Sequence, residues 1–255
     1  MRRLMPSGKR KSMPLREEYE KTGNWLFKRR SYVPVLFFGL ALLSLQYYRP
    51  LESPLADQLW EGLCLFVSLC GLAIRVLTVG HTPRGTSGRN TRGQVASVLN
   101  TTGIYSVVRH PLYFGNFLMW FGVSLFPRLW WFSALCILLF WVYYERIMFA
   151  EEAFLREKFG ESYVSWAGRT AAFVPSFRNG YVRPDGRFSW KKVLRKEYNG
   201  LLAVVMCLFF LEVVGDYLSG SPVRVDTMWV VILGLTIGAW VILRLLKHWT
   251  SLLRE

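Results

Sequence analysis

The stretches TTGIYSVVRHPLYFG (residues 101–115) and ERIMFAEEAFLREKFG (residues 145–160) decide the fold. Arg109 and His110 stand directly before one apolar segment, and the adjacent Glu151 and Glu152 stand directly after the next. Only the short break Phe-Pro-Arg at residues 126–128 separates the two segments. We therefore expect two antiparallel helices that bring the two polar clusters to the same surface of a membrane.

Composition indicates a membrane protein. Hydrophobic residues make up 52% of the 255 residues, and the mean hydropathy is positive. The net charge of +15 suits either nucleic acid or a membrane surface. A nucleic-acid binder would cluster its Lys and Arg on a folded polar domain, whereas here they alternate with apolar segments. The membrane is therefore the expected partner, and nucleic acid is not.

Six apolar segments predict an all-α, polytopic fold with about six transmembrane helices. Most are near the ~20 residues that a helix needs to cross the hydrocarbon core. Lipid offers no hydrogen-bond partners, so the backbone groups of a span must bond to one another, as they do in a helix. The alternation of polar and apolar residues that is typical of outer-membrane strands is absent from these segments. The expected spans are residues 32–48, 57–79, 111–126, 129–149, 199–217 and 228–246.

The distribution of basic residues predicts the orientation. With a cytoplasmic N-terminus and six crossings, 28 of the 32 Lys and Arg fall on the inner side. Both termini are then cytoplasmic, in the inner membrane if the source is bacterial. Four tryptophans fall where helices should begin at the outer interface, as an aromatic belt would. They are Trp60, Trp130, Trp131 and Trp229.

The chain divides into three parts by this interpretation. Residues 1–31 form a basic cytoplasmic leader, with residues 17–30 as a helix on the membrane surface. Residues 32–198 form a core of four spans with inner-face loops and a helix, and residues 199–255 add two spans. The leader is too long and lacks the small-residue cleavage site of a secretory signal.

Two inner segments are unlike simple connections. Residues 80–108 hold five glycines, five threonines, three arginines and no acid. Such a segment can bind an anion through backbone N–H groups, or it can be a flexible polar linker. Residues 150–160 predict a helix that ends at Gly160. The segment that follows it is rich in aromatic residues and arginine, which suits the membrane interface better than single-stranded nucleic acid.

A compound motif resembles the integral-membrane methyltransferases, a family that groups isoprenylcysteine carboxyl methyltransferases and phospholipid methyltransferases. The resemblance covers about residues 70–176. It rests on TGIY (102–105), RHPLYFG (109–115), EE (151–152), FGESY (159–163) and VP (174–175). The chain departs from the family pattern at Trp166, where a tyrosine is usual, and at AGRTAAF (167–173), where a basic run is usual.

The resemblance implies S-adenosylmethionine as the methyl donor and a lipid or lipophilic acceptor that arrives through the membrane. It also implies a cofactor site at the cytoplasmic face. The cofactor-binding roles fall on Gly103, Tyr105, His110, Tyr113, Gly115, Glu151 and Glu152.

The acceptor determines the catalytic roles. An amine headgroup must lose a proton, for which Glu151 would serve as base. A carboxylate or phosphate needs only a cation, for which Arg109 is suited. Plainer explanations stay open at this point: Glu152 can pair with Arg156 on a helix surface, and Arg109 can be a topology signal.

Other polar groups give weaker signals. The four cysteines, in apolar segments and without CxxC spacing, indicate neither a disulfide framework nor a zinc site. His81 and His248 are isolated, so no metal site is expected. Glu212 lies near the predicted outer end of its span, where its side chain can reach water. A non-catalytic binding or assembly protein and a small transporter are the alternative functions.

Overall fold

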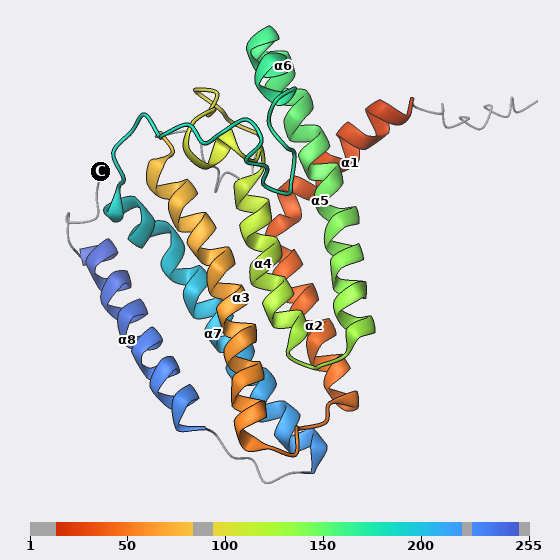
Figure 1. Cartoon of the computed structure of the whole chain (residues 1–255), viewed down its shortest axis with the longest axis vertical. Coiled ribbons are helices and arrows are strands. Elements are labelled where there is room, and N and C mark those ends of the chain that lie inside the picture. The colour runs from red at the N-terminus through yellow and green to blue at the C-terminus, as the bar shows by residue number, and fades with distance from the viewer. Residues whose placement is uncertain (1–13, 84–93, 221–225, 250–255) are drawn as a thin grey trace, which may run out of the picture.

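The computed structural model describes residues 14–83, 94–220 and 226–249, and within these ranges it contains helices and no strand (Figure 1). The long helices run side by side and form one bundle. In chain order the elements are α1 (Leu15–Arg29), η1 (Arg30–Tyr32), α2 (Val33–Ser44), η2 (Leu45–Tyr47), α3 (Pro54–His81), η3 (Gly103–Ser106), α4 (Pro111–Leu125), α5 (Trp130–Phe159), α6 (Glu161–Ala167), α7 (Trp190–Ser219) and α8 (Thr227–Trp249).

Four helices, α3, α5, α7 and α8, are long and apolar enough to cross a membrane. They coincide with four of the six expected spans. The other two expected spans contain α2 and α4, of 12 and 15 residues. At 1.5 Å per residue these helices are about 18 and 22 Å long, which is less than the ~30 Å hydrocarbon core. The described residues therefore contain four helices of spanning length, and the count of six crossings stays a prediction.

The expected helical hairpin is formed by α4 and α5. Pro111 occupies the first turn of α4, where its missing N–H is no loss. The chain reverses at residues 126–128, where Arg128 has a positive φ of 61°. The separate helix expected at residues 150–160 is wrong as a separate element, because α5 continues unbroken through this segment. It ends before Gly160, whose φ is 54°, at the residue predicted from the sequence.

Small residues let α3 and α4 approach closely. A Cβ atom at Gly71 would lie 2.4 Å from the carbonyl oxygen of Gly115. A Cβ atom at Gly122 would lie 2.2 Å from Oγ of Ser68. No side chain fits at such distances, so these glycines set the spacing of the two helices. Close packing of this kind is typical of helices in membranes.

The surface helix expected at residues 17–30 corresponds to α1, which packs against α5. The hydroxyl of Tyr143 donates a hydrogen bond to the carbonyl of Leu26 at 2.9 Å. A Cβ at Gly23 would lie 2.1 Å from the carbonyl oxygen of Arg146. This part of the predicted leader is therefore packed on the bundle.

The C-terminal helices also join the bundle directly. Helix α7 begins at Trp190, and the hydroxyl of Ser189 caps it by accepting from the backbone N–H of Lys192 at 3.3 Å. The boundary predicted after residue 198 thus falls inside one helix. Helix α7 packs against α3, and α8 packs against α7.

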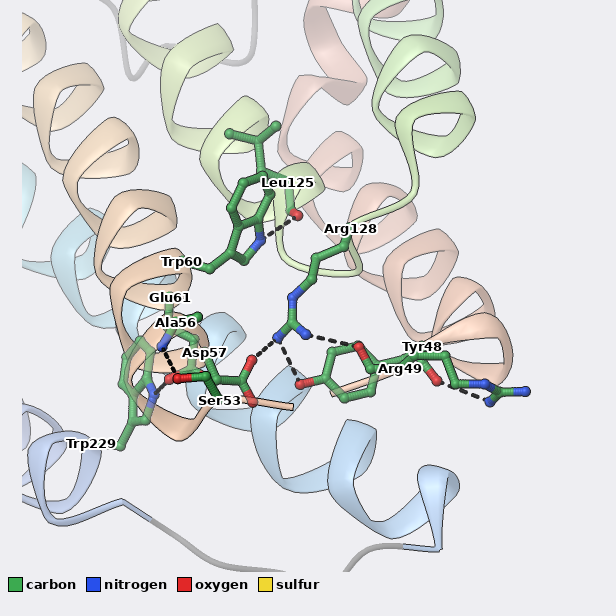
Figure 2. Close-up of polar contacts among 10 residues, drawn as sticks. All are labelled: Tyr48, Arg49, Ser53, Ala56, Asp57, Trp60, Glu61, Leu125, Arg128 and Trp229. Atoms are coloured by element: carbon green, nitrogen blue, oxygen red, sulfur yellow. Dashed lines mark hydrogen bonds and ion pairs between the residues drawn. The ribbon is translucent and has the colours of Figure 1, made fainter. Parts of the chain in front are cut away.

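A polar cluster ties the helices together at the end of the bundle that holds the α4–α5 turn (Figure 2). Arg128 contacts the carboxylate of Asp57, and it donates to the hydroxyl of Tyr48 at 3.1 Å and to the carbonyl of Arg49 at 2.8 Å. The indole of Trp60 donates to the carbonyl of Leu125 at 3.1 Å. These contacts hold the α4–α5 turn against α3 and the end of η2.

Two expectations about this end are wrong. The indole N–H of Trp229 donates to Oε2 of Glu61 at 2.7 Å (Figure 2), and Trp229 is fully buried, so it is not part of an aromatic belt. Trp130, by contrast, is 82% exposed. Glu212 is buried beside Glu61 and does not reach water. The sequence pattern does not indicate that Trp229 and Glu212 meet Glu61, because these residues belong to helices far apart in the chain.

Candidate functional site

Arg109, His110, Glu151 and Glu152 meet at the end of the bundle opposite the α4–α5 turn. The imidazole Nε2 of His110 lies 2.9 Å from Oε1 of Glu152, and its Nδ1 lies 3.5 Å from Oε2 of Glu151. Nη1 of Arg109 donates to Oε2 of Glu152 at 2.9 Å. The start of α4 and the last turns of α5 thus bring together the two clusters that the sequence predicted to be neighbours.

The connection between α6 and α7 holds the segment that carries Arg109 and His110. The backbone N–H of Arg109 donates to the carbonyl of Ala171 at 2.8 Å, and that of His110 donates to Ala172 at 3.2 Å. The N–H of Ser176 donates to the carbonyl of Val107 at 2.9 Å. These are backbone contacts, which any side chain permits. The unusual AGRTAAF segment therefore performs this positioning through its backbone and does not need the usual basic run.

A cavity of about 420 Å³ opens beside the cluster. This volume is within the usual range for sites that hold small molecules. Its walls come from α1, η1, α3, the residues before η3, and α4 to α6. Lining residues with polar or aromatic side chains are Phe27, Arg30, Ser31, Arg75, Gln94, Asn100, Tyr105, Arg109, His110, Tyr113, Asn116, Glu151, Glu152, Phe154, Tyr163 and Trp166.

Aromatic side chains form much of the wall. The ring of Tyr113 stacks on His110 with centroids 5.6 Å apart. The indole N–H of Trp166 donates to the carbonyl of Tyr105 at 3.1 Å and so fixes the segment that carries that phenol. Tyr163 lies against Trp166, with ring centroids 5.8 Å apart. The departure from the family pattern at Trp166 thus adds a hydrogen bond to the wall.

Five of the seven residues expected to bind the cofactor line the cavity, and two do not. Gly103 has a φ of 62° and donates its N–H to the carbonyl of Val182 at 2.9 Å, so it forms a turn under the 176–188 segment. Gly115 faces α3, where a Cβ would lie 2.7 Å from Cγ of Arg75. The structure gives both glycines packing roles.

Burial and charge set the protonation of the groups outside the helices. Burial lowers the pKa of His110, but hydrogen bonds to Glu151 and Glu152 and their negative charges outweigh burial, so its pKa lies above the ordinary value. Burial raises the pKa of the Tyr105 phenol, and the charge of Glu151 adds to this effect. These surroundings favour the cationic form of the imidazole and the neutral form of the phenol in the same cavity.

Two buried polar atoms at this site have no hydrogen-bond partner among the described residues. They are Nε of Arg109 and the hydroxyl oxygen of Tyr163. A buried donor without a partner costs about 1–3 kcal/mol. Both atoms belong to residues that line the cavity, and the Tyr163 hydroxyl lies near the charges of Glu152 and Arg109.

Sequence reasoning missed the floor of the cavity. Arg75 from α3 and Asn116 from α4 line it, and Arg75 pairs with Glu197 from α7. The signal in the sequence was Arg75, an arginine inside an apolar span, because an ionisable residue at such a position is by default a candidate functional residue. The 80–108 segment is only partly described. Residues 94–96 and 98–100 line the cavity, whereas the anion-binding alternative rests mainly on residues 84–93, outside the described residues.

The described residues contain no group of three or more metal-ligating side chains, and the four cysteines are unpaired. Nδ1 of His81 donates to the carbonyl oxygen of Leu77 at 3.0 Å, and its ring lies against Phe188. The described site is therefore built from a histidine, two carboxylates, arginines and aromatic rings.

These features define an integral membrane protein with a polar cavity at one end of a helical bundle. Residues 61–162 match the model of the phospholipid methyltransferase family. The resemblance noted from the motifs is thereby confirmed for the segment that carries His110, Glu151 and Glu152, and it implies methyltransferase activity. No curated protein and no solved structure matches the chain.

Proposed function

We propose that this protein transfers a methyl group from S-adenosylmethionine to a lipid or lipophilic acceptor at the membrane surface beside His110. The observation that carries the proposal is the cavity in which His110, Glu151 and Glu152 converge, within the segment that matches the methyltransferase family. The acceptor would present a carboxylate, a phosphate or an amine.

The residues that line the cavity fit this cofactor. Glu151 and Glu152 can accept hydrogen bonds from its amino group and ribose hydroxyls, and their charge favours a cation. The rings of Tyr105, Tyr113 and Trp166 suit a flat purine. Tyr163 and Arg109 supply further polar side chains in the cavity wall. When bound, S-adenosylmethionine supplies an activated methyl group on a positively charged sulfur.

The protein's own contribution is alignment and the exclusion of water. Of the two acids, Glu151 makes the longer contact to His110, 3.5 Å against 2.9 Å for Glu152. Its carboxylate is therefore the better placed to take a proton from an amine acceptor. Arg109 was expected to hold an anionic acceptor, and here its Nη1 is engaged with Glu152. We propose that it positions Glu152, and its role as an acceptor clamp stays a prediction.

The six-crossing topology, with the site and both termini in the cytoplasm, is part of the proposal. In Figure 1 the first turn of α1 and the last turn of α8 both lie toward the end of the bundle that carries α6 and the cavity. This placement agrees with an even number of crossings. The concentration of Lys and Arg in the segments at this end supports its cytoplasmic assignment.

Two alternatives have different signatures. A binding or assembly protein would hold the donor without releasing a methylated product. A transporter has one observation in its favour, the buried acids Glu61 and Glu212 in two spans. These acids lie at the end of the bundle away from the cavity, and both α3 and α7 are unbroken at them.

The test uses the full chain in detergent with lipid. Equilibrium dialysis with radiolabelled S-adenosylmethionine measures donor binding, and lipid mass spectrometry with and without donor identifies the product. We expect saturable binding that Glu151→Ala and His110→Ala weaken at least about tenfold, whereas His248→Ala, on an exposed part of α8, leaves it unchanged. Binding without any methylated lipid would favour the assembly protein. No donor binding would refute the proposal.

A further inference from the structure

The floor of the cavity carries an ion pair that the proposed methyl donor does not require. Nε and Nη2 of Arg75 donate to the two carboxylate oxygens of Glu197 at 2.8 and 3.0 Å. Nη1 of Arg75 donates to the amide oxygen of Asn116 at 2.6 Å. The pair joins α3 to α7, and α7 lies outside the segment that matches the family.

This floor lies deeper in the bundle than the histidine and the two acids. Arg75 precedes the end of α3 by six residues, Asn116 follows the start of α4 by five, and Tyr144 precedes Glu151 by seven. At 1.5 Å per residue Arg75 and Asn116 lie about 8–9 Å below the ends of their helices, and Tyr144 lies about 10 Å below Glu151. The cavity therefore has two polar layers at different depths.

The deeper layer offers hydrogen-bond donors. Glu197 has both oxygens engaged by Arg75, its side chain is only 6% exposed, and it does not line the cavity. Arg75 lines the cavity with a side chain that is 20% exposed. Three of the five N–H groups of a guanidinium are used in the contacts given above, which leaves two for a ligand.

Gly115 makes room for this arginine. The stem of Arg75 passes so close to α4 that a Cβ at position 115 would lie 2.7 Å from its Cγ. The motif glycine that sequence reasoning placed at the cofactor therefore serves the floor. Asn116, the next residue, donates from its amide to the hydroxyl of Tyr144 at 3.5 Å, which fixes its oxygen toward Arg75.

We infer that Arg75 anchors the methyl acceptor, that Glu197 is its positioning residue, and that the acceptor is a lipid with a negatively charged oxygen, phosphate or carboxylate. This inference rests on the proposed function and deepens it. Burying an ion pair within the bundle costs free energy unless hydrogen bonds satisfy both partners. A guanidinium held by Glu197 and Asn116 is pre-organised to donate to an anionic oxygen. The carboxylates of Glu151 and Glu152 in the upper layer then face the cationic donor, and the guanidinium of the deeper layer faces the anionic acceptor.

The test measures binding of lipid probes to the full chain in detergent by native mass spectrometry. The probes are dihexadecyl phosphate, palmitate and uncharged dioleoylglycerol, and S-adenosylmethionine binding is measured separately. We expect Arg75→Met to weaken binding of at least one anionic probe at least about tenfold. Dioleoylglycerol and the methyl donor should keep their affinities within about threefold. The probe that loses affinity distinguishes a phosphate from a carboxylate acceptor.

A charge-swapped variant separates anchoring from a merely structural role. Arg75→Glu combined with Glu197→Arg restores an ion pair between α3 and α7 but moves the guanidinium to α7. We expect this variant to unfold close to the wild-type temperature while its anionic-lipid affinity stays low. Arg244→Met, on the exposed side of α8, is the matched control and should bind as the wild type does.

Two results would overturn the inference: unchanged anionic-lipid affinity in Arg75→Met, or full recovery of that affinity in the charge-swapped variant. Neither depends on whether the wild type binds S-adenosylmethionine. A wild type that fails to bind the donor would refute the proposed function alone.

Discussion

Nε2 of His110 and Oε1 of Glu152 lie 2.9 Å apart, although α4, a turn and most of α5 separate them in the chain. The contact closes the α4–α5 hairpin at the end opposite its turn. Arg109 donates to the other oxygen of Glu152. Glu152 is therefore the shared partner of two neighbouring bases, whereas Glu151 lies 3.5 Å from His110 and interacts with the hydroxyl of Tyr113.

This asymmetry predicts different effects of removing the two charges. Glu152→Gln removes the anion that Arg109 and His110 share. We expect it to lower the free energy of unfolding by only about 1–2 kcal/mol, because the site is partly exposed. Glu151→Gln should cost less than about 1 kcal/mol. Thermal unfolding in detergent, followed by circular dichroism, measures both. A larger loss in Glu151→Gln than in Glu152→Gln would contradict the arrangement.

The raised pKa of His110 predicts a pH dependence of stability. Because the folded-state pKa lies above the ordinary value of 6.5, the cationic imidazole stabilises the fold fully below about pH 6.5. That stabilisation is lost as the pH rises through the folded-state pKa. The unfolding temperature of the wild type should therefore fall progressively as the pH rises from about 6.5 to the folded-state pKa of His110. Thermal unfolding measured at half-unit steps of pH checks the slope.

The matched variant for this experiment is His110→Gln. Glutamine keeps a polar side chain but does not titrate, so the groups that face position 110 are left to act alone. These are Arg109, Tyr113, Glu151 and Glu152. The variant should be less stable at neutral pH and should lose the slope above pH 6.5. A slope of wild-type size in the variant would assign the titration to another group.

The hairpin and its polar clusters were predictable because the information is local. A proline at residue 111, a break at residues 126–128 and a glycine at residue 160 mark helix ends in the sequence itself. Two helices joined by a short turn are antiparallel neighbours. The meeting of His110 with Glu151 and Glu152 follows from these facts.

The remaining parts of the site and fold depend on contacts between distant elements. The pair of Arg75 with Glu197 and that of Trp229 with Glu61 join residues more than 100 positions apart. Their existence depends on the order and rotation of helices in the bundle, which hydropathy does not specify. For the same reason sequence could not tell a cofactor glycine from a packing glycine at position 115.

Gly115 gives a direct test of that packing role. Gly115→Ala places a Cβ 2.7 Å from Cγ of Arg75 and 2.8 Å from the carbonyl oxygen of Gly71. We expect the crowding to lower the unfolding free energy by about 1–3 kcal/mol. In Gly39→Ala the added methyl group meets nothing within 4 Å, and higher helix propensity should leave stability unchanged or raise it by up to about 1 kcal/mol. Equal effects of the two changes, measured by thermal unfolding, would remove the case for close packing.

Trp229 tests whether the far end of the bundle acts independently of the site. Trp229→Phe removes the N–H that donates to Glu61 at 2.7 Å and leaves a buried carboxyl group short of a partner, which costs about 1–3 kcal/mol. Trp130→Phe is the matched control, because Trp130 is 82% exposed, and its effect should lie within about 0.5 kcal/mol.

Trp229 and Thr236 are the buried residues of α8. Loss of the Trp229–Glu61 hydrogen bond should therefore loosen α8 first and increase the hydrogen exchange of its amides. Donor affinity should not change, because the His110 cavity lies at the other end of the bundle. A Trp229→Phe protein that binds S-adenosylmethionine more weakly while Trp130→Phe binds normally would show that the two ends are coupled.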